Sequence, residues 1–147
     1  MISNYASNLI LKNLCGKTQN ATIAQRAFLA LSSTEPTASG GGVTEPTGNG
    51  YARKQIGYYQ DTYGQLMGNP ENGVITNAQE IHFDEATGPW GTLTYGCIYD
   101  AAANGNLIAW GELGEYNEEN VWTAKSITPA ANTVVVIKVG NLKISLT

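Results

Sequence analysis

Residues 78–111 read AQEIHFDEATGPWGTLTYGCIYDAAANGNLIAWG, and this stretch decides the fold. Its central part, Thr92–Asp100, alternates in side-chain type as a half-buried β-strand does. One face of that strand is expected to carry Leu93, Tyr95, Cys97 and Tyr99. The Asn104-Gly105 pair is typical of a type I′ hairpin turn, because both central positions of that turn need positive φ. We therefore predict a strand over 92–100, a tight turn, and a partner strand over 106–112.

The same stretch is short of residue types that do chemistry. His82 is the only histidine of the chain, and its alternate neighbours along the expected strand are Glu80 and Asp84. We interpret His82 as a solvent-facing strand residue beside carboxylates rather than as half of a catalytic pair. The Gly-x-Ser-x-Gly motif of a nucleophile elbow does not occur in the sequence. No catalytic residue is predicted, and a hydrolase is the weakest functional hypothesis.

Composition limits the partners that the chain can have. Charged residues make up 14% of 147 residues and the net charge is −4, which disfavours a nucleic-acid partner. No apolar run is long enough for a membrane span, and the first residues lack the features of a secretory signal. With one histidine and two distant cysteines, no metal site and no cofactor are predicted. The acidic segment Glu115–Asn120 is interpreted as a solvated loop rather than a calcium site.

The N-terminal residues have the spacing of an amphipathic helix. Apolar side chains recur there at Ile2, Tyr5, Ala6, Leu9, Ile10 and Leu14. Ser3 or Asn4 is a suitable N-cap, and Gly16 suits the position after the last turn. We predict a helix over 3–15, within an N-terminal helical arm of residues 1–24. Its apolar face is expected to pack against the domain or against a partner subunit.

The remaining residues, 25–147, predict one β domain. Beyond the strands already described, strands are expected at 26–31, 51–56, 73–76, 80–83, 121–127, 133–139 and 142–146. The run 133–139 is so rich in β-branched residues that both of its faces are expected to be covered. The predicted fold is mainly β, an antiparallel β-sandwich or jelly-roll-like barrel with one N-terminal α-helix.

Aromatic residues and cysteines carry the remaining expectations. Trp90 follows the turn at Gly88-Pro89 and is expected to be exposed, which makes it a candidate glycan contact, whereas Tyr95 and Trp110 are expected in the core. A tyrosine-rich insert over 57–70 is expected to form a loop over a sheet edge. Cys15 and Cys97 are interpreted as two buried thiols.

Several ordered motifs resemble a known protein family. They are Phe28–Leu31, Glu35–Thr37, Gly42–Pro46 and Gly50–Arg53 in the front half, then 73–77, 81–88, 90–94, 98–101 and 105–109. Over roughly residues 25–147 this pattern resembles a family of small tailed-bacteriophage structural proteins often labelled phage tail fibre protein. The motifs are turns and strands rather than a catalytic signature, and the insert at 57–70 departs from the pattern.

The resemblance implies a non-enzymatic structural component of a tailed-phage virion, made in the host bacterial cytoplasm. Such a protein would act by assembly, as a head decoration or a tail or fibre-associated protein. Its partners would be other virion proteins and further copies of itself, with a trimer as one arrangement. The candidate assembly residues are Ile2, Tyr5, Leu9, Ile10, Tyr58, Tyr59 and Tyr63. The alternative is a carbohydrate-binding host-attachment module that uses Trp90.

Overall fold

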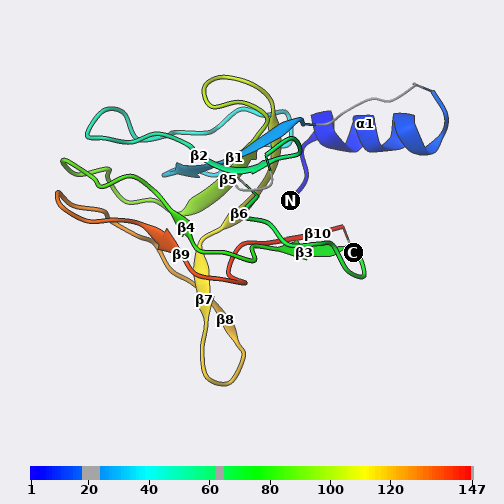
Figure 1. Cartoon of the computed structure of the whole chain (residues 1–147). Helices are drawn as coiled ribbons and strands as arrows, with labels where there is room; N and C mark the ends of the chain where they lie inside the picture. The colour runs from blue at the N-terminus through cyan, green and yellow to red at the C-terminus, as the bar shows by residue number, and fades with distance from the viewer. Residues whose placement is uncertain (18–23, 62–64, 147) are drawn as a thin grey trace.

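A computed structural model describes residues 1–17, 24–61 and 65–146. The described strands form a four-stranded antiparallel sheet of order β2-β1-β5-β6 and three two-stranded antiparallel ribbons, β10-β3, β4-β9 and β7-β8 (Figure 1). The elements are α1 (Asn4–Leu14), β1 (Arg26–Ser32), β2 (Lys54–Tyr58), β3 (Val74–Thr76), β4 (Ile81–His82), β5 (Tyr95–Tyr99), β6 (Leu107–Glu112), β7 (Gly114–Tyr116), β8 (Trp122–Ala124), β9 (Val136–Ile137) and β10 (Lys143–Ser145).

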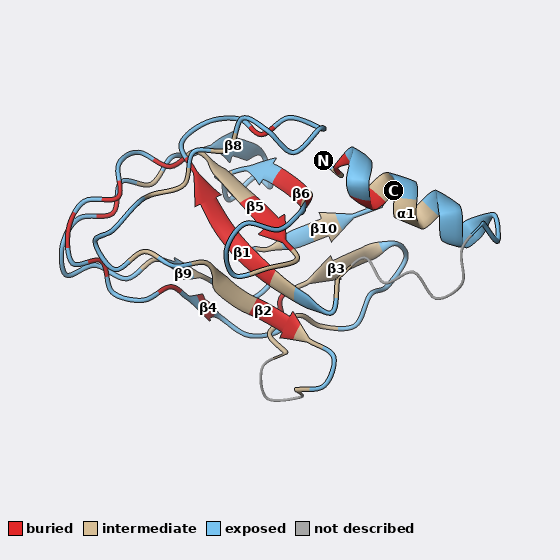
Figure 2. Ribbon diagram, turned by 90° about the horizontal axis from the view of Figure 1, so that it is seen from above, coloured by how far each residue is buried: buried red, intermediate tan, exposed pale blue. Residues whose placement is uncertain are grey.

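Strand β1 is central and is buried on both faces (Figure 2). It pairs with β2 on one side and β5 on the other, and where the β2 ladder ends the Leu31 amide donates to the Tyr51 hydroxyl at 3.0 Å. Leu29 and Leu31 pack into the larger core cluster, whereas Ala30 packs into a smaller cluster on the opposite face. A continuous apolar run is what a strand with two covered faces requires.

The larger cluster holds the layers together. It joins one face of the central sheet to the segments that carry β3, β4, β9 and β10, which lie along one side of that sheet (Figure 1). Its buried members are Leu29, Leu31, Ile56, Ile81, Phe83, Ala86, Trp90, Leu93, Ile98 and Ala109. The smaller cluster on the other face contains Ala30, Cys97, Tyr99, Leu107 and Trp110. The expected burial of Trp110 is confirmed, and Tyr95 packs against this cluster while remaining partly exposed.

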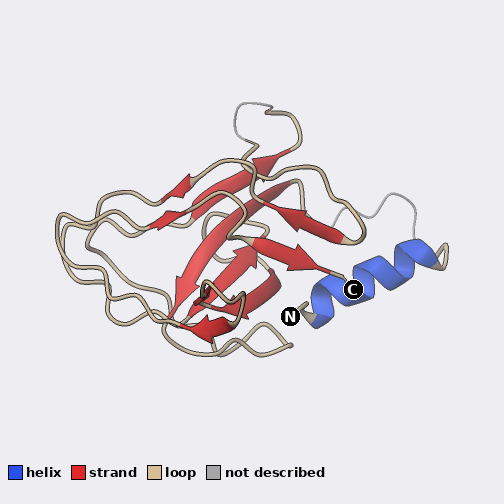
Figure 3. Cartoon of the chain, turned by 90° about the horizontal axis from the view of Figure 1, so that it is seen from below, coloured by secondary structure: helices blue, strands red, loops and turns tan. Residues whose placement is uncertain are grey.

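The predicted fold class is confirmed as mainly antiparallel β structure with one N-terminal helix (Figure 3). Over the described ranges the strands do not close into a barrel, because the central sheet ends at β2 and β6. The arrangement is closer to a sandwich in which one layer is a regular sheet and the other is built from short ribbons. The strands of the second layer are only two or three residues long, so loops make up much of it.

The N-terminal residues attach the helix to the edge of the central sheet. Ile2 bridges to Ala109 of β6, and the Ser3 amide donates to the Ile108 carbonyl at 2.8 Å. The Ser3 side chain then accepts the Ala6 amide at 3.2 Å, as an N-cap does. Gly16, with φ of 61°, follows the last turn. The predicted helix is confirmed, with Ser3 as its cap.

The turn between β5 and β6 is wider than the sequence predicts. Asn104 and Gly105 have the expected positive φ values of 54° and 75°. However, the strands are joined by a longer loop, because the Asp100 carboxylate accepts the Asn106 amide at 2.6 Å and its side-chain nitrogen at 2.8 Å. The predicted hairpin is confirmed, since β5 and β6 pair antiparallel, but its connection is longer than a tight turn because β5 ends at Tyr99 and β6 begins at Leu107.

The run 133–139 is mostly outside a sheet. Only Val136 and Ile137 form a strand, β9, which pairs with β4 in a two-stranded ribbon. Val134, Val136 and Val139 are exposed, so the prediction that both faces are covered is wrong. A β-branched run indicates extended backbone, but its burial depends on neighbours that are distant in the sequence.

The insert after β2 returns to the sheet that it leaves. The Leu66 amide donates to the Ile56 carbonyl at 3.0 Å, on the edge of β2 that faces away from β1. Met67 then bridges to Asn77. The described part of the insert therefore lies over an edge of the central sheet, as expected. The strand predicted over 51–56 is found as β2 at Lys54–Tyr58, so it begins three residues later and ends two residues later than predicted.

Candidate assembly surfaces

Helix α1 carries apolar side chains that the described part of the chain leaves exposed. Its first turn packs on β6 and buries Ala6, while Ile2, Leu9 and Ile10 are half-buried and Tyr5 is exposed. Further along, Leu11 is 58% and Leu14 76% exposed. These two side chains are three residues apart and so are neighbours on one face of the helix. Figure 1 shows the helix projecting from the side of the β layers.

Leu11 was absent from the predicted assembly residues, although it is one of the most exposed apolar side chains of the helix. Apolar periodicity predicted which residues share a helix face. It cannot predict how far the domain extends beneath that face. Here the cover ends after the first turns, so the exposed apolar surface includes Leu14 of the predicted stripe and Leu11 beside it.

The tyrosine candidates lie at the opposite edge of the central sheet. Tyr58 ends β2, and its ring meets the ring of Tyr59 edge to face, with 5.7 Å between centroids. The Arg26 guanidinium lies 4.3 Å from the centre of the Tyr58 ring, and Tyr59 is 65% exposed. Tyr63 lies outside the described residues. Because α1 packs on β6, the structure does not bring these tyrosines together with the helix residues.

Trp90 is part of the core, so the expectation that it is exposed is wrong. Its side chain is packed edge to face against Tyr51, with 5.2 Å between ring centroids, and the residue is only 6% exposed. Its indole N–H donates to the Asn49 carbonyl at 2.8 Å. The Asn49 side chain in turn donates to the Pro89 carbonyl at 2.9 Å, which holds the Gly88-Pro89 turn over the core. A glycan has little access to this indole.

The β7–β8 hairpin presents an aromatic surface that the sequence analysis missed. Tyr116 and Trp122 are directly paired across the ribbon and are 62% and 42% exposed. The Trp122 ring lies against Gly114, where an added Cβ would come within 2.6 Å of it. One side of the indole is therefore fixed on the backbone. The hairpin projects from the body in Figure 1.

This hairpin was hard to predict because its strands contain three residues each. Glu115–Asn120 was interpreted as an acidic loop, whereas its first residues form β7. Three residues are too few for alternation to be recognised. The pairing of Tyr116 with Trp122 could have been found by looking for aromatic residues placed symmetrically about Asn117–Val121, where the Asn117 amide donates to the Val121 carbonyl at 3.0 Å.

An ion pair that the sequence analysis did not identify lies where residues 45–53 meet the β5–β6 loop. The Arg53 guanidinium binds both carboxylate oxygens of Glu45, and its side chain is only 7% exposed. It also donates to the Ala101 and Asn104 carbonyls at 2.9 and 2.7 Å, and lies 3.6 Å from the centre of the Tyr99 ring. The contacts join the end of the 43–53 segment to the β5–β6 loop.

Tyr51 extends this network to β1. Its hydroxyl donates to Glu45 at 2.9 Å and accepts the Leu31 amide at 3.0 Å. Burial raises the pKa of Tyr51 and of Tyr99 above the usual tyrosine value, so both hydroxyls stay neutral. Burial alone would lower the pKa of Arg53, but the hydrogen bond and charge of Glu45 raise it overall. These groups hold one another in place and leave no activated nucleophile.

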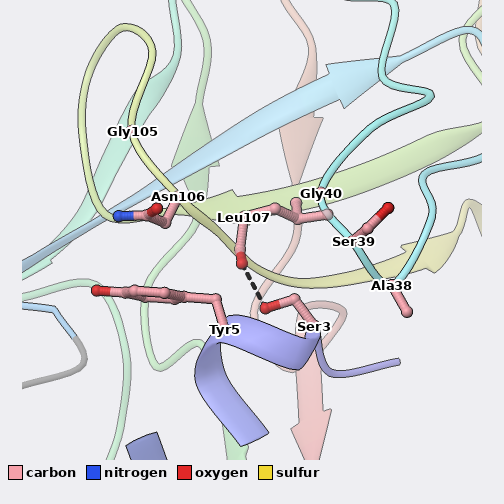
Figure 4. Close-up of a pocket in the computed structure, with 8 residues that line it drawn as sticks. All are labelled: Ser3, Tyr5, Ala38, Ser39, Gly40, Gly105, Asn106 and Leu107. Carbon is pink, nitrogen blue, oxygen red and sulfur yellow. Dashed lines mark hydrogen bonds between the residues drawn. The ribbon is translucent and has the colours of Figure 1, made fainter. Parts of the chain in front are cut away.

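A small hollow lies where the helix meets the sheet (Figure 4). Its volume is about 130 Å³, and it is lined by Ser3, Tyr5, Ala38, Ser39, Gly40, Gly105, Asn106 and Leu107. Sites for small molecules are usually about 300–1,000 Å³. The hollow is therefore better suited to a few water molecules than to a substrate. The Ser3 hydroxyl donates to the Leu107 carbonyl at its rim.

His82 lies where the sequence analysis predicted. It is exposed on β4, and its Nε2 is 2.9 Å from a carboxylate oxygen of the equally exposed Glu80. Among the described residues, no group of three or more histidine, cysteine or acidic side chains is placed to hold a metal ion. None of the described helices is both long enough and apolar enough to cross a bilayer.

The cysteines differ from each other, so the prediction of two buried thiols is half wrong. Cys97 is fully buried in β5, whereas Cys15 is exposed just after α1, and neither forms a disulfide. The exposure of Cys15 follows from the exposed end of the helix. Burial raises the pKa of the Cys97 thiol to about 12, with a smaller contribution from Glu45.

At pH 8, and at concentrations low enough for the protein to be monomeric, the native protein is expected to react with Ellman's reagent at one thiol per chain. Cys15 should react because it is accessible, and Cys97 should not react until guanidinium unfolds the chain and releases its second thiol. A Cys15→Ser variant provides the control and should show no fast reaction. Fast reaction of this variant in the native state would contradict the burial of Cys97.

Comparison with known proteins places the chain in a family. No curated protein matches it. A family model described as Podophage GP4 fiber I protein gp80 matches residues 1–144. The match confirms the resemblance to phage tail-fibre proteins, which was seen over roughly residues 25–147, and extends it to the N-terminal residues that carry α1. Since nearly the whole chain is matched, this protein belongs to the Gp80 family, the family of the podophage GP4 fiber I protein gp80.

Proposed function

We propose that this protein is a non-enzymatic structural component of a tailed-phage virion, acting by protein–protein assembly in or beside a tail fibre. The family match over residues 1–144 carries this proposal, since membership of a fibre family supports a structural role. The surface agrees with it, because the helix and the hairpin both project with large apolar side chains exposed. Such patches on a soluble protein often mark binding surfaces for other proteins.

The partners in this proposal are other virion proteins and further copies of the chain. Residues 1–24 would serve as an assembly arm and 25–147 as the body, with the virion as the final location after synthesis in the host bacterium. Head decoration is the competing position within the virion. The fibre position is favoured by the family description.

The carbohydrate-binding alternative loses the residue on which it rested. It was predicted to act through Trp90, which is packed against Tyr51 and donates its N–H to a backbone carbonyl. A glycan array with the purified protein would test it directly. Binding that Trp90→Phe and Trp122→Ala variants both retain would show that any glycan site lies elsewhere on the chain.

Purified virions of the phage that encodes this chain provide the decisive experiment. Antibody labelling in electron microscopy is expected at the tail fibres, and virions from a mutant that lacks the protein should lose that label. Labelling of the head surface would favour decoration over the fibre position. Absence of the protein from density-gradient-purified virions would refute the proposed function.

A further inference from the structure

Charge is divided unevenly between the helical arm and the body. Residues 1–24 contain two basic residues, Lys12 and Lys17, and no acidic residue. Residues 25–147 contain six basic and twelve acidic residues, which gives +2 for the arm and −6 for the body. A basic arm on an acidic body predicts that the arm of one molecule is attracted to the body of another.

The arm surface combines this charge with exposed apolar side chains. We define it as Leu11, Lys12, Leu14 and Lys17, all of which are exposed at the far end of α1 and just beyond it. Leu11 and Leu14 are more than half exposed. Lys12 and Lys17 lie close to this apolar pair in the sequence, so the end of the arm fits a partner surface that is both apolar and acidic.

The hairpin surface has those properties. We define it as Tyr116, Glu118, Glu119, Val121 and Trp122, all of which are exposed. Residues 114–124 contain three glutamates and no basic residue. The nearby Lys125 is held by Glu115 at 2.7 Å, and Glu115 faces away from the paired Tyr116 and Trp122 because adjacent strand residues alternate.

The hairpin surface is also ordered in advance of binding. The Asn117 side chain accepts the Glu119 and Val121 amides at 3.0 and 2.8 Å, which fixes the tip. The Trp122 indole lies against Gly114, as described above. A surface that needs little ordering loses less conformational entropy when a partner binds.

The two surfaces of one chain are held apart. Residues 1–3 run antiparallel to β6 and pair with 108–110, so α1 leaves near Leu107 at the start of β6. The hairpin continues from Glu112, at the other end of that strand. The two elements project in different directions in Figure 1. A contact between these surfaces therefore requires two molecules.

We propose that the arm surface of one copy docks on the hairpin surface of a second copy, with leucines against the aromatic pair and lysines against the glutamates. Because two different surfaces meet, the contact is heterologous, and repetition closes a ring when the rotation between copies permits it. This inference rests on the proposed function, since it names the partner through which the chain assembles.

A mixing experiment tests the contact. The arm variant is Leu11→Ser with Leu14→Ser, and the hairpin variant is Tyr116→Ser with Trp122→Ser. Light scattering after size exclusion is expected to give an oligomer for the unaltered protein and a monomer for each variant alone. An equimolar mixture should form a 1:1 dimer that grows no further, because only one native arm and one native hairpin remain to pair.

Matched controls keep this experiment decisive. Val134→Ser with Val139→Ser removes exposed apolar side chains elsewhere and should leave the oligomer intact. Circular dichroism of all variants should match the unaltered protein. An oligomer retained by either variant, a mixture that stays monomeric, or a monomeric unaltered protein would overturn the proposed contact. If the mixing experiment failed but antibody still labelled the tail fibres of purified virions, the proposed function would stand and only the proposed contact would fall.

Charge reversal gives a second, independent test. Lys12→Glu, or Glu118→Lys with Glu119→Lys, should each weaken association by about 5-fold per reversed contact, as expected for exposed pairs worth up to about 1 kcal/mol. Combining the arm and hairpin reversals in one chain should restore much of the lost affinity. Association that is unchanged by the single reversals, or that is not restored by the combination, would contradict the pairing of lysines with glutamates.

Discussion

Replacing Trp90 with alanine is expected to lower the free energy of unfolding by about 3–5 kcal/mol, the usual cost of removing a large buried aromatic. The indole packs against Tyr51 and Phe83, and its N–H satisfies the Asn49 carbonyl. Alanine would leave a cavity between the central sheet and the second layer, whereas the Asn49 carbonyl would keep the Thr87 amide as a donor at 3.0 Å. Urea denaturation followed by circular dichroism measures the loss directly.

Trp122 provides the matched control for this measurement. It is also a tryptophan, but it lies on the projecting hairpin and is 42% exposed. Trp122→Ala is expected to change the unfolding free energy by less than about 1 kcal/mol, because little buried area is lost. Both proteins should be measured at concentrations low enough to be monomeric. Equal losses for the two variants would contradict the assignment of Trp90 to the core.

Replacing Arg53 with methionine is expected to be similarly costly, at about 3–5 kcal/mol, because it removes the cation beside the Glu45 carboxylate and leaves only the Tyr51 hydroxyl bound to it. Arg53 also supplies hydrogen bonds to the Ala101 and Asn104 carbonyls, which would lose their donor. The β5–β6 loop should therefore become more accessible as well. Hydrogen exchange of the loop amides, together with urea denaturation, reports both effects.

A double-mutant cycle separates the ion pair from these other contacts. If Glu45 and Arg53 interact as the structure indicates, Glu45→Gln with Arg53→Met should cost less than the sum of the single substitutions. The exposed pair Lys125–Glu115 gives a comparison, and Lys125→Met should cost less than about 1 kcal/mol. Additive losses at Glu45 and Arg53 would refute their coupling.

The features predicted well from the sequence are those that local patterns determine. The helix was predicted because its apolar spacing, its Ser3 cap and Gly16 all agree on the same bounds. Strand β1 was predicted because an apolar run bounded by polar segments indicates a buried strand. In these elements the local pattern and the tertiary environment favour the same structure.

The errors arise where distant residues decide the outcome. Trp90 follows a Gly-Pro turn, and only the fold brings Asn49 across to receive its indole N–H. The Glu45–Arg53 pair likewise depends on a loop that reaches the pair from residues 101–104. Strand β8 lies within the strand predicted over 121–127, but β7 and its pairing with β8 were missed because these strands are too short to show a period. Sequence patterns predict backbone type more reliably than they predict which side chains meet.

The pairing of residues 1–3 with β6 also affects how copies of this protein can join. A bare edge strand is a template on which another chain can add a strand without limit, as in amyloid-like fibres. Here Ile2 and Ser3 occupy that edge on β6, and Leu66 occupies part of the opposite edge on β2. Removing residues 1–3 would expose the edge of β6 and favour the addition of strands from other copies. The N-terminal residues therefore cover the β6 edge of the central sheet against strand addition by another copy.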